Sequence, residues 1–130
     1  MAVTLSLLLA GCSEGERKAD PKQIEASSKQ VAAAVARFEQ ATQRRNFKAI
    51  CARLFTPGAR ERAGGKDCAK LLRSTAADVR RPRIRVLSIR IRGARAEARV
   101  RTRARGQAPL DDRIVLERRR GRYLIEALVD

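Results

Sequence analysis

The sequence predicts an α+β domain in which three N-terminal helices pack on one face of a curved four-stranded antiparallel sheet. Two patterns support this prediction. Between residues 20 and 75 apolar residues recur at spacings of three and four, which is typical of amphipathic helices. From Arg83 onward apolar residues alternate with charged ones, which is typical of strands with one buried face. Helices that precede the strands as a block indicate an α+β architecture.

The first helix is expected to begin after Asp20 and to run to about Arg45. Asp20 is an N-cap acceptor, Pro21 suits the first helical position, and Gln23 follows three residues after the cap. One apolar stripe follows along this helix and is expected to face the core. Its members are Ile24, Val31, Val35, Phe38 and Thr42.

Two further helices follow. Asn46 can cap the second, whose inward residues recur with full helical periodicity: Phe47, Ile50, Cys51, Leu54 and Phe55. Thr56 and Pro57 end it and cap a short turn over residues 57–62, and a loop at Gly64 and Gly65 comes next. Asp67 opens the third helix, with Cys68, Leu71, Leu72 and Thr75 pointing inward.

Four strands complete the domain. In residues 83–92 the apolar parity slips between Val86 and Leu87, which predicts a β-bulge. Gly93 makes a turn, residues 94–105 alternate without a fault, and a loop covers residues 106–110. The last two strands are expected at residues 112–119 and 122–129, joined by a tight turn at Arg120 and Gly121.

The alternation in residues 94–105 predicts that the small apolar side chains face the helices and that five arginines point outward: Arg95, Arg99, Arg101, Arg103 and Arg105. Residues 83–122 hold 14 arginines and four acids, and the whole chain has a net charge of +16. We expect this face to contact anionic lipid headgroups or cell-wall polymers. The alternative is that codon bias supplied the 24 arginines and that they serve solubility only.

The chain has three cysteines and no histidine. The run from Leu5 to Ala10 is mainly apolar but too short to span a bilayer. It ends in Leu9-Ala10-Gly11-Cys12, which resembles the lipobox of bacterial lipoprotein signal peptides. The resemblance implies cleavage before Cys12, a lipid on its sulfur, and residence on the extracytoplasmic face of the cell membrane. Residues 1–11 would then be the signal and residues 12–19 a charged tether. The basic residues that usually open a signal peptide are missing, and the alternative is a frayed apolar end with a chance cysteine.

Cys51 and Cys68 remain as an even pair in a chain that the signal would send to an oxidising compartment. Both occupy inward positions on predicted helices. A disulfide between them is expected, and two buried free thiols are the alternative.

Residues 20–130 form one predicted domain whose layout resembles the nuclear transport factor 2-like superfamily, also called the SnoaL-like or cystatin-like α+β cone. The resemblance is carried by residues 38–45, by the ICARLFTP segment at 50–57, by residues 68–72 and by the strand, turn, Gly, aromatic, strand pattern at 116–125. Enzymes of this superfamily place Asp, His or Tyr in an apolar pocket. None of these residues can be carried over, because the chain lacks His, its one Tyr is Tyr123 on the last strand, and no acid lies on an apolar strand face. Asp78, Glu117 and Glu126 are interpreted as loop or surface charges.

These observations predict a lipid-anchored envelope protein of accessory or binding type, with no catalytic activity, cofactor or metal. One alternative is a cone-fold enzyme or carrier for a small apolar molecule, which would need a cavity lined by Phe38, Phe55, Ile89 and Tyr123 with a buried carboxylate. A second is a nucleic-acid-binding protein, suggested by a pI near 11.4. Few aromatic residues are available for base stacking, so no nucleic-acid partner is expected. The oligomeric state stays open, a dimer included.

Overall fold

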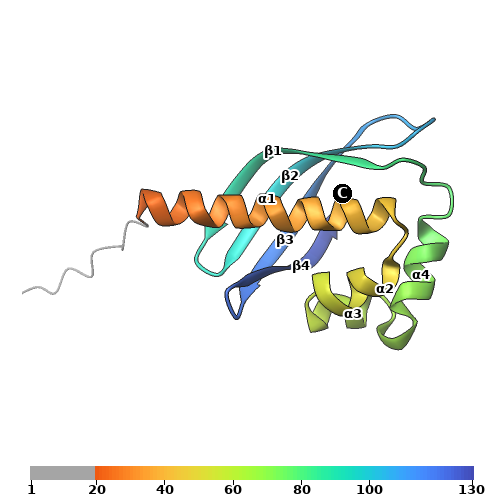
Figure 1. Ribbon diagram of the computed structural model, residues 1–130, viewed down its shortest axis with the longest axis horizontal. Helices are drawn as coiled ribbons and strands as arrows, with labels where there is room; N and C mark the ends of the chain where they lie inside the picture. The colour runs from red at the N-terminus through yellow and green to blue at the C-terminus, as the bar shows by residue number, and fades with distance from the viewer. Residues whose placement is uncertain (1–19) are drawn as a thin grey trace, which may run out of the picture.

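The computed structural model describes residues 20–130, which fold into a helical layer on one face of a curved antiparallel sheet (Figure 1). The helical elements are α1 (Pro21–Gln43), α2 (Phe47–Ala49), η1 (Ile50–Leu54), α3 (Pro57–Arg62), η2 (Gly65–Asp67) and α4 (Cys68–Thr75). The strands are β1 (Arg83–Arg92), β2 (Arg95–Arg103), β3 (Leu110–Arg119) and β4 (Arg122–Val129), in the order β1-β2-β3-β4. The predicted α+β class is therefore confirmed. Cys12 and the predicted tether lie outside the described residues.

The helix caps follow from local sequence. Asp20 accepts a hydrogen bond from the backbone N–H of Lys22 at 3.0 Å, and Asn46 accepts one from Ala49 at 3.2 Å. Thr56 Oγ1 accepts from Ala59 N at 3.0 Å, which caps α3. Each side chain satisfies an amide that has no partner inside its helix. Residues 57–62, predicted as a turn, thus form a helix of their own.

The second helix differs from its prediction in its last turn. It begins as α2 and widens into the π-helical segment η1, in which the N–H of Phe55 donates to Ile50 O at 2.9 Å. Phe55 itself is extended and forms a bridge with Ile125 of β4. Helical periodicity predicted that Phe55 belongs to the second helix. In the structure its pairing with Ile125 of β4 ends the helix at Leu54.

Three residues that were predicted to point inward are exposed: Ile24, Leu71 and Thr75. Ile24 is 41% exposed, in the first turn of α1, where it only borders a shallow hollow together with Ile91 of β1 and Arg118 of β3. Leu71 is 49% exposed, because the two-turn helix α4 lies at the edge of the molecule and turns mainly Cys68 and Leu72 toward the core.

Two register shifts curve the sheet. Val86 pairs with Val100 and Ser88 with Arg99, so Leu87 is the extra residue of the predicted bulge on β1. A second shift on β4, which was not predicted, leaves Glu126 as the extra residue between Ile125 and Ala127. The turn between β3 and β4 has positive φ at both central residues, 51° at Arg120 and 76° at Gly121, as a two-residue hairpin turn requires.

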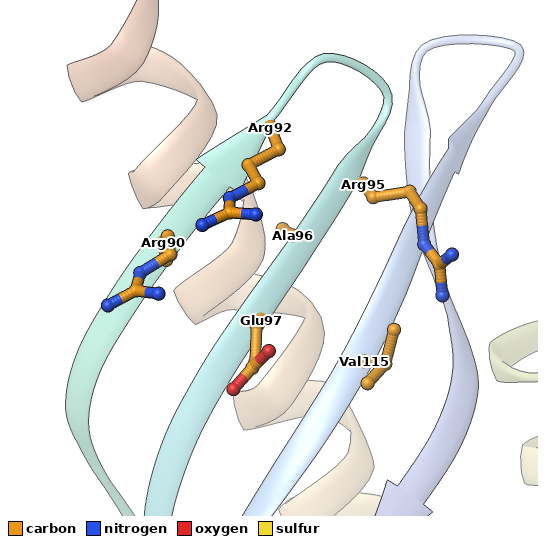
Figure 2. A pocket seen from close by; sticks show the side chains of 6 residues that line it. All are labelled: Arg90, Arg92, Arg95, Ala96, Glu97 and Val115. Atoms are coloured by element: carbon orange, nitrogen blue, oxygen red, sulfur yellow. The ribbon is translucent and has the colours of Figure 1, made fainter.

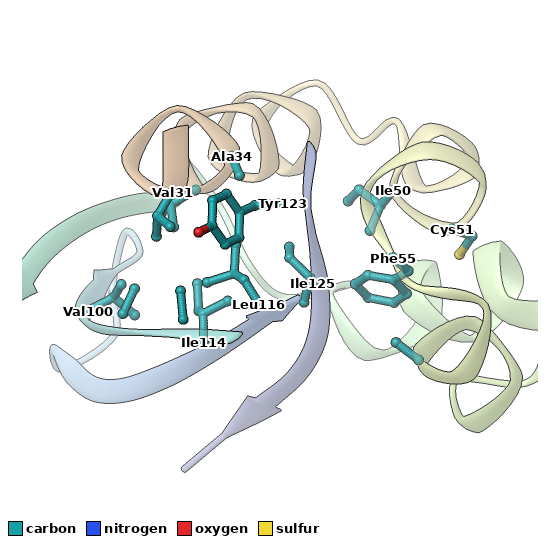
Figure 3. Close-up of a cluster of buried hydrophobic side chains, with 14 of the residues drawn as sticks. Val31, Ala34, Ile50, Cys51, Phe55, Val100, Ile114, Leu116, Tyr123 and Ile125 are labelled. Atoms are coloured by element: carbon teal, nitrogen blue, oxygen red, sulfur yellow. The ribbon is translucent and has the colours of Figure 1, made fainter. Parts of the chain in front are cut away.

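The core lies between α1 and the inner face of the sheet, and it extends beneath the short helices (Figure 3). Small residues on the inner face of β2, namely Ala96, Ala98 and Val100, are nearly inaccessible to solvent. The larger side chains are Ile114, Leu116, Tyr123 and Ile125 of the sheet with Val31 and Val35 of α1 and Phe47, Ile50 and Phe55 of the following segment. Cys51 and Cys68 are buried and disulfide-bonded, with their Cα atoms 6.1 Å apart. The predicted bond therefore links η1 to α4.

Within residues 20–130, no helix has both the length and the apolar character needed to cross a bilayer.

Candidate anion-binding face

The outer face of the sheet, turned away from α1, carries a dense set of arginines. Strand pairing fixes which side chains share this face, because directly paired residues of an antiparallel sheet point to the same side. Arg83, Arg85, Arg90 and Arg92 of β1 pair with Arg103, Arg101, Glu97 and Arg95 of β2. We call the following set the outer basic face: Arg83, Arg85, Arg90, Arg92, Arg95, Arg99, Arg101, Arg103, Arg113, Arg119 and Arg122.

Burial on the opposite side forces this arrangement. Alternate residues of β2 are buried beneath α1, so the intervening arginines must point to solvent. Arg95, Arg99 and Arg103 are exposed as predicted, and Arg101 is half-buried. Arg105 is not on this face, which corrects the prediction. β2 ends at Arg103, and beyond it the N–H of Arg105 donates to Arg80 O at 2.8 Å, at the rim of the sheet.

Three acids on the outer face neutralise part of its charge. Asp111 accepts two hydrogen bonds from Arg101, at 2.7 and 3.1 Å, which raise the pKa of Arg101 and hold that of Asp111 below its usual range. Arg113 pairs with Glu97 at 3.5 Å, and Arg119 lies 3.3 Å from Glu117.

Eight arginines of the face make no ion pair with any residue from 20 to 130. They are Arg83, Arg85, Arg90, Arg92, Arg95, Arg99, Arg103 and Arg122. Seven of them lie on β1 and β2, whereas the outer side of β4 carries the half-buried apolar residues Leu124, Ala127 and Val129. The positive charge is thus concentrated on one half of the face.

A shallow hollow of about 280 Å³ lies on this half, near the β1–β2 turn (Figure 2). Arg90 and Arg92 come from β1, Arg95 from β2, and Val115 of β3 lies further across the sheet. Glu97 also lines the hollow, but its carboxylate contacts Arg113. Three guanidinium groups that have no carboxylate partner among residues 20–130 surround one hollow, and they can donate paired hydrogen bonds to phosphate, sulfate or carboxylate oxygens.

The four residues named for an apolar cavity belong to the packed core and its margin: Phe38, Phe55, Ile89 and Tyr123. They do not line one common cavity, although Phe55 also borders a shallow hollow of about 260 Å³ together with Glu126. Tyr123 is buried among Val31, Leu116 and their neighbours, and its hydroxyl has no hydrogen-bond partner within residues 20–130 (Figure 3).

Glu126 is more than the surface charge that its sequence context indicated. Its Oε2 accepts a hydrogen bond of 2.6 Å from Thr56 Oγ1, and its Oε1 and backbone oxygen accept from Arg62 at 2.8 and 2.6 Å. The Thr56 hydroxyl and the Arg62 guanidinium hold the pKa of Glu126 below its usual range. Such a carboxylate stays ionised and joins α3 to β4, unlike a general base whose pKa is raised toward neutrality. Glu126 lies in this position because it is the extra residue of the bulge on β4, and the sequence pattern did not indicate that bulge.

Glu117 is a surface charge, as predicted, and Asp78 is exposed in the segment between α4 and β1. Among residues 20–130, no three side chains of His, Cys, Asp or Glu type gather closely enough to hold a metal ion.

No family model and no curated protein matches the chain. Among solved structures, a "De novo designed NTF2 fold protein NT-9" is similar at 17% identity with a TM-score of 0.48, over 82% of this chain and 85% of that one. The "Crystal structure of a de novo designed protein with curved beta-sheet" is similar at 23% identity with a TM-score of 0.41, over 50% of this chain and 61% of the other. At these scores neither likeness bears on function, and the α+β fold is established by the order and pairing of the elements themselves.

Proposed function

We propose that this protein is a non-catalytic binding module that contacts anionic groups of the cell envelope, acidic lipid headgroups or cell-wall polymers, through its outer basic face. The observation that carries the proposal is the set of eight arginines without acidic partners among residues 20–130, seven of them on two adjacent strands. Lipidation of Cys12 would hold the module at the surface that it contacts.

The spacing of the arginines favours an extended anionic partner. Neighbouring strands lie about 4.8 Å apart and alternate residues of a strand about 6.6 Å apart, so the guanidinium groups form a two-dimensional array. Arginines also pair directly across strands, as in Arg83 with Arg103 and Arg92 with Arg95. Like charges in such pairs destabilise a sheet. An anionic surface would remove this repulsion, and each basic residue would contribute about 1 kcal/mol to binding near it.

Vesicle co-sedimentation tests the contact. Every protein in the experiment is the full chain with Cys12→Ser, so that no lipid is attached. We expect binding to vesicles that contain phosphatidylglycerol, no binding to phosphatidylcholine vesicles, and weakening as salt shortens the Debye length. Reversing charge at Arg95, Arg99 and Arg103 should weaken binding by at least about a hundredfold, because loss of each arginine removes about 1 kcal/mol, 1.4 kcal/mol is tenfold, and the new acids add repulsion. None of the three takes part in an ion pair with residues 20–130.

The matched control reverses the same amount of charge on the helical layer, at Arg37, Arg53 and Arg73, which are all exposed. If both triple variants lose binding equally, net charge and not the outer face is responsible. If the parent chain does not bind these vesicles even at low salt, the proposal is wrong and the arginines serve solubility only.

Membrane attachment is tested separately in the native host. Cys12→Ser should leave the precursor uncleaved or release the protein from the membrane fraction, and the mass of the mature N-terminus should change accordingly. Unchanged fractionation and mass would show that Cys12 is not lipidated.

A further inference from the structure

The C-terminal end of α1 lies near the start of β1, at the opposite end of the sheet from the β1–β2 turn (Figure 1). Residues from the end of α1 and from the connection before β1 line a second concave region there. Its volume is about 500 Å³. It lies between three segments that are far apart in the sequence: the end of α1, the connection from α4 to β1, and the residues after β2. We call it the rim pocket, and its polar lining residues are Thr42, Gln43, Arg45, Arg80, Arg81 and Arg105.

Hydrogen bonds between these segments hold the rim pocket in shape. Gln43 Nε2 donates to Pro82 O at 2.8 Å, which joins α1 to the connection before β1. Arg45 Nη1 donates to Ala76 O at 3.2 Å, and the N–H of Arg105 donates to Arg80 O at 2.8 Å. The pocket walls are therefore positioned by the fold itself, which lowers the ordering cost of binding a ligand.

The lining combines high positive charge with backbone strain. It contains four arginines and neither Asp nor Glu, and none of the four makes an ion pair within residues 20–130. Arg45 and Arg81 also have left-handed backbone conformations, with φ of 55° and 48°. Such conformations are unfavourable for residues other than glycine and cluster at functional sites. The Arg45 guanidinium carbon lies 5.3 Å from the centre of the Phe47 ring, which further orients it.

We infer that the rim pocket binds a multiply charged oxyanion, of the phosphoryl class, independently of the outer basic face. Guanidinium groups bind phosphoryl oxygens in a forked, two-point geometry, and four of them can accommodate more than one negative charge. Small-molecule sites commonly measure about 300–1,000 Å³, so the pocket has room for a phosphate ester or a diphosphate. A soluble metabolite and a lipid headgroup offer the same phosphoryl chemistry.

Titration calorimetry with inorganic pyrophosphate tests this inference on the full chain with Cys12→Ser. We expect one saturable site per chain. The Arg80→Gln, Arg105→Gln double variant should bind at least about tenfold more weakly, since hydrogen bonds to charged groups are the strong ones and 1.4 kcal/mol is tenfold. The backbone bond between these two residues does not use their side chains, so the fold should persist, as an unchanged thermal transition would verify.

The matched control is the Arg37→Gln, Arg53→Gln double variant, which removes the same charge from exposed positions on the helical layer. It should retain pyrophosphate binding within about twofold. The inference is wrong if both double variants weaken pyrophosphate binding equally, or if the parent chain shows no saturable binding at low salt. Neither result bears on the outer basic face, which the vesicle experiment tests separately.

A second arm identifies the source of the phosphoryl group. If the Arg80, Arg105 variant binds vesicles that contain phosphatidic acid, whose headgroup is a phosphomonoester, as the parent does, the pocket serves a soluble anion. If that variant loses vesicle binding as well as pyrophosphate binding, the pocket takes a lipid headgroup. Either result supports the pocket, provided that pyrophosphate binding depends on Arg80 and Arg105.

Discussion

Thr56 is the residue at which one hydroxyl group connects two parts of the fold. The side chain is fully buried, and Oγ1 accepts from Ala59 N at 3.0 Å while it donates to Glu126 Oε2 at 2.6 Å. Thr56→Val removes the hydroxyl and keeps the shape of the side chain. Loss of an N-cap acceptor costs about 1 kcal/mol, and loss of a hydrogen bond to a charged group costs about 1.5–3 kcal/mol.

Together these losses predict a decrease of about 2–4 kcal/mol in the free energy of unfolding for Thr56→Val. A domain of this size loses roughly 4–8 °C in Tm for each kcal/mol, so the Tm should fall by roughly 10 °C or more. Urea unfolding at pH 7, followed by circular dichroism, measures the difference. Thr56→Ser is the control, since it retains both hydrogen bonds. If Thr56→Ser is as destabilising as Thr56→Val, or if Thr56→Val stays within about 0.5 kcal/mol of the parent, the hydroxyl does not have this role.

Glu126 gives the same network a dependence on pH. Its pKa in the folded protein is lowered, first by the Thr56 hydroxyl and then by Arg62. A carboxyl with a lowered folded pKa stabilises the fold above its unfolded pKa of about 4.3, and this stabilisation disappears as pH falls through the folded value. The stability difference between the parent and Glu126→Gln should therefore be largest near neutral pH and shrink below about pH 4. A difference that is constant from pH 7 to pH 3 would refute the ionised interaction.

Three further changes are expected to act on stability, each measured by urea unfolding. Replacing both Cys51 and Cys68 by Ala should cost about 3 kcal/mol, as for a closed loop of roughly 15 residues, and reductant should destabilise the parent but not this variant. Leu116→Ala removes a side chain with 0% exposure from the centre of the core and should cost about 2–5 kcal/mol, so a loss below 1 kcal/mol would argue against tight packing there. Gly121→Ala places a Cβ at φ 76° and should cost about 1–2 kcal/mol, and an unchanged midpoint would contradict the tight turn.

The features that the sequence determined are those set by near neighbours along the chain. Asn46 and Thr56 cap the helices that follow them, because a cap requires only an acceptor and amides two or three residues ahead. The bulge at Leu87 was readable as a break in parity within one strand. The Cys51–Cys68 bond followed from an even pair on inward helical positions.

The outward direction of Arg95, Arg99 and Arg103 could likewise be predicted, because residues that alternate with a buried set must face solvent. The alternation along a strand does not show which acid, if any, lies opposite each arginine. Only the register between β2 and β3 places Asp111 opposite Arg101, and the registers of all three strand pairs are needed to show which arginines lack an acid among the described residues.

Tertiary structure alone decided the contacts between segments that are distant in the chain. Thr56 and Glu126 are 70 residues apart and meet because a bulge on β4 makes Glu126 an extra residue beside α3. Arg105 lies in the rim pocket because β2 ends at Arg103 and the chain then bonds to Arg80. Such contacts cannot be predicted from the local sequence. They depend on where each strand ends, on register shifts between strands, and on which helix packs beside them in the folded core.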